Sequence, residues 1–154
     1  MRGGQGHSVD ARKWREAFLT IRLAPAVPAD IACMFEAARG SMLYGYFFQP
    51  LMAMGAAQCY RVLESGVRAS CAAAGLPVSC ADNQVKQHPL TSAHNLRTLV
   101  KQGVISATDL KRWQQAREMR DWVVAPENQT ALTFDQGVTV LTRAAELLGT
   151  LFRA

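Results

Sequence analysis

Several features that would assign this chain to a protein class at once are missing. Its four cysteines form no CxxC pair, and no histidine lies near them at zinc-site spacing. We therefore expect no zinc site, no disulfide framework and no cofactor. No apolar run approaches the about 20 residues that a membrane-spanning helix needs. Residues 1–8, MRGGQGHS, also lack the apolar core of a secretory signal. These absences predict a cytoplasmic protein that does not enter a membrane.

Strand patterns are missing as well, because no stretch alternates apolar and polar residues over enough positions. The chain has 154 residues, of which 49% are hydrophobic and 19% charged, as expected for one globular domain with a real core. Its formal net charge of +5 leaves room for an acidic partner such as RNA or nucleotide phosphate. The basic residues are spread along the chain, so a basic surface without a nucleic-acid role fits as well.

Apolar residues instead recur at helical spacing along most of the sequence. We predict an all-α fold, an antiparallel helical bundle of about five main helices plus a short N-terminal helix. Residues 9–154 form this single domain, after a glycine-rich tail at 1–8 that we expect to be disordered. Residues 76–90 are expected to form a long loop. The predicted helices span about 10–23, 29–47, 50–74, 91–103, 107–124 and 134–152.

Some residues inside these helices invite particular expectations. Gly40 and Gly45 lie in an apolar helix, where we expect them to allow close approach of a neighbouring helix. Cys33 and Cys59 fall in apolar patterns, in which a reduced thiol behaves as a small hydrophobe. Four neighbouring aromatic residues could stack on a nucleic-acid base, although their helical spacing favours core or dimer contacts. These are Tyr44, Tyr46, Phe47 and Phe48.

The segment 107–124 has an unusual charged residue on its apolar face. Four apolar residues share that face with Arg120: Leu110, Trp113, Ala116 and Val123. A guanidinium on such a face needs a partner, because burying it unpaired is very costly. The partner is either a carboxylate of the chain (Asp121, Glu118 or a glutamate on another helix), or a phosphate or dimer interface. Arg112 and Arg117 are expected to be solvated, and Trp113 to lie in the core.

Capping signals frame this segment and the helix after it. Ser106 and Asp109 form a capping-box-like start, and Pro126 ends the helix. Thr133 and Gln136 repeat the signal ahead of the last helix.

Residues 116–127, AREMRDWVVAPE, resemble the signature helix of HEPN-like (higher eukaryotes and prokaryotes nucleotide-binding) domains. The mark of these all-α domains is an arginine, a polar residue, a short apolar spacer and a histidine, often followed by proline. Arg120, Asp121 and Pro126 match this pattern, with residues 122–124 as the spacer, whereas Ala125 occupies the histidine position. The likeness spans residues 30–153, and residues 35–70 resemble helical pairs of a bacterial mobile-element branch.

The resemblance implies a homodimer in which both motifs line one cleft, and RNA cleavage without a metal ion. Histidine would exchange protons and arginine would stabilise the developing phosphate charge. Arg120, Asp121 and Ala125 are thus the candidate catalytic positions, but alanine has no group that can transfer a proton. His88 and His94 could replace the missing base only if the fold brought them near Arg120; we expect surface or loop roles for both.

Two explanations fit Ala125: a naturally degenerate domain, or a ribonuclease whose histidine has been replaced. Our leading hypothesis is a HEPN-like homodimer that no longer cleaves RNA and binds RNA or a partner protein, such as an antitoxin in a toxin–antitoxin or defence system. The first alternative is a metal-independent endoribonuclease, a toxin or defence effector, inactivated at Ala125. The second is a helical protein-interaction module unrelated to nucleic acid.

Overall fold

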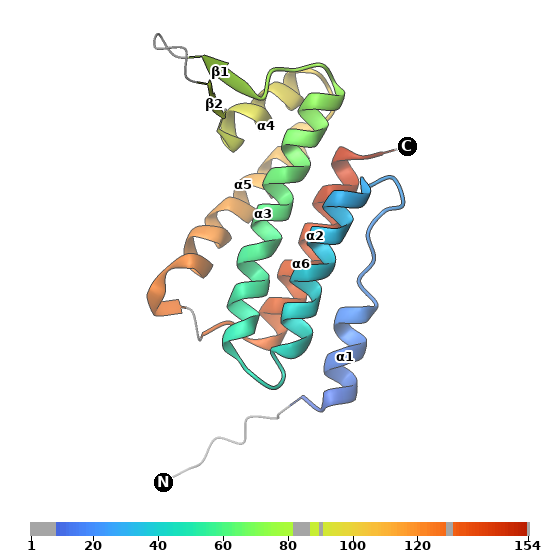
Figure 1. Cartoon of the computed structure of the whole chain (residues 1–154), viewed down its shortest axis with the longest axis vertical. Coiled ribbons are helices and arrows are strands. Elements are labelled where there is room, and N and C mark those ends of the chain that lie inside the picture. The colour runs from blue at the N-terminus through green and yellow to red at the C-terminus, as the bar shows by residue number, and fades with distance from the viewer. Residues whose placement is uncertain (1–8, 82–86, 90, 129–130, 154) are drawn as a thin grey trace.

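The computed structural model describes residues 9–81, 87–89, 91–128 and 131–153. The tail predicted at 1–8 lies outside this range. Within it the chain forms an all-α bundle with five main helices and a short N-terminal helix, which confirms the predicted fold class (Figure 1). The elements are α1 (Ala11–Leu19), α2 (Ala29–Tyr44), α3 (Pro50–Ala73), β1 (Ser79–Ala81), β2 (Gln87–Pro89), α4 (Ser92–Lys101), α5 (Ala107–Val124), the 3₁₀ turn η1 (Pro126–Asn128) and α6 (Phe134–Leu151).

Helices α3 and α6 form the centre of the bundle. Helix α3 packs against α2, α4, α5 and α6, whereas α6 also contacts α1 and α2. The predicted apolar stripe of α3 is buried throughout: Met52, Ala56, Cys59, Leu63, Val67 and Cys71. On α6 a second stripe is buried beside the first, as expected for a helix with several neighbours: Val140, Ala144, Leu147 and Leu151. One continuous hydrophobic core joins all six helices.

Side-chain caps fix where two helices start. The Ser106 hydroxyl accepts a hydrogen bond of 3.0 Å from the Asp109 N–H at the start of α5. At the start of α6, Thr133 and Gln136 form a complete capping box, in which each side chain bonds the other residue's backbone N–H. Both predicted starts are confirmed, because capping is a local interaction that the sequence specifies directly.

The predicted loop at 76–90 was only partly right. Strands β1 and β2 form a short antiparallel pair within it, with Cys80 opposite His88. Three residues per strand are too few for the period-two pattern by which strands are recognised in a sequence.

The predicted ends of the first two helices were too far along the chain. Helix α1 ends at Leu19, and α2 ends at Tyr44 instead of residue 47. A Cβ on Gly45 would lie 2.7 Å from the Met52 side chain on α3 and 2.9 Å from the Met42 carbonyl oxygen, so a larger residue would clash where the chain turns. Close approach is thus confirmed at Gly45, but it is wrong for Gly40, which has no neighbour within 4 Å.

Two further expectations concern cysteine and the membrane. Cys59 is fully buried as predicted, whereas Cys33 is exposed, because it lies on the outer side of α2. No helix in the described part of the chain is long and apolar enough to cross a membrane.

Candidate functional site

Helix α5 holds Arg120 at the edge of the core. Trp113, Ala116 and Val123 on the same face are buried, and the Arg120 side chain is 33% exposed. The helix stops at Val124, because a proline at 126 disfavours helical backbone at the residue before it. Ala125 accordingly adopts an extended conformation (φ −63°, ψ 130°) and is half-buried.

Two carboxylates hold the Arg120 guanidinium. Its Nη1 donates to Oε1 of Glu64, on α3, over 2.9 Å. Its Nε and Nη2 donate to Oδ1 of Asp121 over 3.1 and 3.0 Å. Of the two predictions for Arg120, ion pairing within the chain is therefore confirmed. A phosphate would have to compete with both carboxylates for this guanidinium.

Among the described residues, no histidine lines the pocket beside Arg120. Ala125 offers only a methyl group, and the carboxylate of Asp121 is occupied by Arg120 itself. His94 is exposed on the first turn of α4, where its backbone N–H bonds the Thr91 hydroxyl. The side chain of His88 lies outside the described part of the structure. The three motif residues thus give an ion pair rather than an acid–base pair.

The neighbouring arginines of α5 differ from one another. Arg112 pairs with Asp109 over 3.6 Å and with Glu146 on α6, and its side chain is 37% exposed, so the expectation that it is solvated holds in part. A carboxylate on a different helix cannot be found from the sequence of α5 alone. Arg117 is exposed as predicted, and it lines a small pocket together with Ser92 and Arg120.

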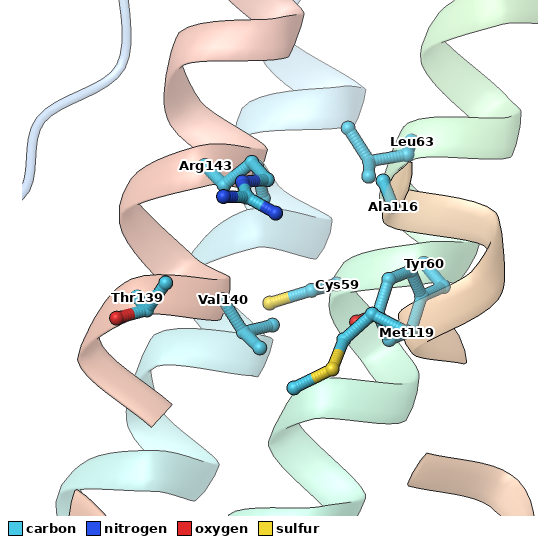
Figure 2. A pocket seen from close by; sticks show the side chains of 9 residues that line it. Cys59, Tyr60, Leu63, Ala116, Met119, Thr139, Val140 and Arg143 are labelled. Carbon is cyan, nitrogen blue, oxygen red and sulfur yellow. The ribbon is translucent and has the colours of Figure 1, made fainter. Parts of the chain in front are cut away.

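A second cavity lies between α3, α5 and α6, with a volume of about 50 Å³. Figure 2 shows the Arg143 side chain reaching from α6 toward the space that Tyr60 and Met119 line. Arg143 is half-buried, and it takes part in none of the ion pairs between described residues. An arginine in a concave, mostly apolar site is suited to bind a single anionic group such as a phosphate.

Two ionisable groups in the wall of this cavity, the Cys59 thiol and the Tyr60 hydroxyl, stay protonated at neutral pH. Burial raises the pKa of the Cys59 thiol to about 12. Burial also raises the pKa of the Tyr60 hydroxyl; the neighbouring Cys59 adds to this effect, and the charges of Arg143 and Arg120 oppose it. Neither group adds negative charge near Arg143 at neutral pH, so the guanidinium remains available to an external anion.

Sequence reasoning did not identify Arg143, although a signal was present. Arg143 lies three residues after Val140 and four before Leu147, on the broad apolar face of α6. This is the same pattern that drew attention to Arg120. In the structure the two differ, since Arg120 is paired with carboxylates and Arg143 lacks a described carboxylate partner.

Among the described residues, no group of three or more histidine, cysteine or acidic side chains is placed to hold a metal ion. Protein-family models, curated proteins and solved structures give no match to this chain. Membership of the HEPN-like group therefore stays a prediction based on the motif residues.

Proposed function

We propose that this chain is a HEPN-like helical domain that binds single-stranded RNA without cleaving it, with Arg143 as a phosphate contact. The observation that carries the proposal is the contrast between two guanidinium groups near Tyr60. Arg120 is held by Glu64 and Asp121. Arg143 lines a neighbouring cavity without a carboxylate partner among the described residues.

The absence of cleavage follows from Ala125 and from the state of Arg120. Cleavage of the RNA backbone needs a group that exchanges protons, and losing it commonly costs about 10²- to 10⁴-fold in rate. Transition-state stabilisation also needs a guanidinium that faces the developing charge. Arg120 is directed toward carboxylates instead, so two requirements of the HEPN reaction are missing together.

Binding is tested with a fluorescein-labelled 20-nucleotide single-stranded RNA. We expect anisotropy to show affinity that falls steeply with salt, and denaturing gels to show intact RNA with or without EDTA. Arg143→Gln should weaken binding and reduce the salt slope by about one contact. Arg143→Lys should retain part of the affinity, and Arg22→Gln, an exposed arginine distant in sequence, is the charge-matched control. Equal losses in the Arg143 and Arg22 variants would remove Arg143 as a specific contact.

Ala125→His tests the inactivated ribonuclease. We expect no cleavage by this variant, because Glu64 and Asp121 still hold Arg120. Cleavage that appears with histidine and disappears again in Ala125→His/Arg120→Ala would establish the alternative. Sedimentation velocity on the same samples tests the predicted homodimer. Indifference to RNA at all salt concentrations, together with a tight protein partner, would favour the interaction module.

A further inference from the structure

Most of the exposed aromatic surface gathers at one turn of the bundle. The connection between α2 and α3 exposes Tyr44 by 65%, Phe47 by 79% and Phe48 by 61%. Core or dimer contacts had been expected for these residues; their exposure excludes the core, and dimer contacts stay a prediction. The helical spacing that suggested a core stops at Tyr44, where Gly45 turns the chain. Exposed aromatic groups in such a cluster mark a binding surface more often than isolated ones do.

Hydrogen bonds hold the backbone of the turn that bears these rings in place. The backbone N–H groups of Phe47 and Phe48 donate to the Tyr44 carbonyl over 3.0 and 3.2 Å. The Ser41 hydroxyl bonds the Leu51 carbonyl, and the Gln49 amide donates to the Leu132 carbonyl over 3.0 Å. Because this backbone is ordered in advance, a ligand that stacks on the rings loses no affinity to ordering the turn itself.

Beside the turn, α1 completes a groove that it lines from Ala11 to Leu19, and Figure 1 shows α1 and this turn in the lower part of the molecule. The groove has a volume of about 320 Å³, at the lower end of the roughly 300–1,000 Å³ of small-molecule sites. Tyr44, Tyr46 and Phe47 line it from the turn, and Trp14 and Arg15 line it from α1. This size fits one nucleoside.

Trp14 connects the wall of the groove to the hydrophobic core. The Trp14 indole N–H donates to the Met42 carbonyl over 3.1 Å. Its ring centre lies 5.7 Å from that of Tyr46, which in turn lies 5.2 Å from that of Phe47. On its inner side Trp14 packs against Phe134 at 4.8 Å. A chain of aromatic rings thus extends from the core to the exposed ring of Phe47.

The charge at the groove is positive. Arg15 lines it, and Lys13 is exposed on the same helix; neither takes part in an ion pair between described residues. The only acidic side chain of α1, Glu16, pairs with Arg12. The ligand that fits must therefore combine a flat apolar group with negative charge.

We infer that this groove stacks one base of a single-stranded RNA, with Arg15 contacting an adjacent phosphate. Stacking on aromatic side chains beside basic residues is the usual chemistry of single-strand binding. A second copy of this chain fits less well, because a twofold contact would bring Arg15 and Lys13 of both copies together. A lipid surface would contact a convex patch, whereas this one is hollowed. The inference rests on the proposed RNA binding and adds a base contact to it.

The test compares two neighbouring phenylalanines. The probe is a ten-residue oligoadenylate with one 2-aminopurine, whose fluorescence is quenched by stacking. Phe47→Ala and Tyr44→Ala should each weaken binding by about fivefold or more and reduce the quenching. Phe48→Ala is the matched control, because Phe48 belongs to the same exposed turn but does not line the groove. Arg15→Gln should weaken binding and lower its salt dependence. Melting temperatures should not change, since these side chains are exposed.

Several outcomes would overturn the inference. Equal losses in the Phe47 and Phe48 variants would mean that the turn has no specific base site. A loss of self-association, or of binding to phosphatidylcholine–phosphatidylglycerol vesicles, with unchanged RNA affinity would assign the groove to that occupant instead. If RNA binding depends on Arg143 but on no groove residue, the proposed function stands and the base site is wrong. If binding depends on the groove residues but not on Arg143, the base site stands and Arg143 is not a phosphate contact. If the wild-type protein does not bind RNA, both proposals are wrong.

Discussion

Two arginines on different sides of the bundle have contrasting surroundings. Arg120 lies at the end of α5 with carboxylates on both sides, at 2.9 and 3.0 Å. Arg15 lies on α1, which does not contact α5 among the described elements, and it lines a groove of exposed aromatic rings. The residue that matches a motif is thus the one with its charge already neutralised. A motif match identifies the type of residue at a position. The ion-pair partners of that residue in the fold decide whether it can also bind a ligand.

Alkaline pH should produce the largest change, because it acts on groups buried in the core beside Arg120. The pKa of Cys59 rises from 9.0 to about 12 on burial, so the folded state keeps a proton that the unfolded thiol loses. Stability is therefore intact below pH 9 and falls between pH 9 and about 12, by up to roughly 1.4 kcal/mol per pH unit. Urea unfolding with reductant measures this slope. Cys59→Ala should reduce it, whereas Cys33→Ala, at an exposed thiol, should retain it.

Gly55→Ala should disturb the side of the molecule that bears the aromatic groove. A Cβ there would lie 2.9 Å from the Ala38 carbonyl oxygen and 3.2 Å from the Met42 backbone nitrogen. Backbone atoms cannot move aside as a side chain can, so α2 and α3 must separate, at a cost of about 2 kcal/mol. Gly40→Ala has free space and should stabilise α2 by about 0.5–1 kcal/mol. Denaturant midpoints of both variants check this, and a stabilised Gly55 variant would contradict the close packing.

Removing the carboxylates around Arg120 should make it resemble Arg15. In Glu64→Gln/Asp121→Asn the guanidinium keeps its position but loses its neutralising partners. RNA affinity at low salt should rise on the order of fivefold. Stability should fall by no more than about 1 kcal/mol, since both carboxylates are partly or largely exposed. The control Asp30→Asn/Asp135→Asn changes the net charge equally on other helices. The same gain in both doubles would show a general charge effect without any release of Arg120.

Much of the helical framework was predictable, because it depends on local interactions. The caps at Ser106 and Thr133 need only neighbouring backbone N–H groups. The stripe of α3 from Met52 to Cys71 is read directly from its spacing. The end of α2 was not predictable in this way, because it depends on how closely Gly45 approaches Met52.

The candidate sites were predictable only in part. The sequence indicated that Arg120 needed a partner, and named Asp121 and a glutamate on another helix among the possibilities. It could not choose Glu64, which lies 56 positions away, because the choice depends on how α3 and α5 pack. The apolar spacing around Arg143 was available, but its surroundings come from three different helices.

By itself the sequence determined the number and type of the helices, their capped starts, the buried faces of α3 and α6, and the lack of a proton-transferring group at Ala125. These properties follow from residue type and spacing along one segment. Only the tertiary structure decided which arginines are neutralised and which aromatic rings are exposed. The reason is physical: an ion pair or a groove depends on distances between segments far apart in the chain, and packing sets those distances.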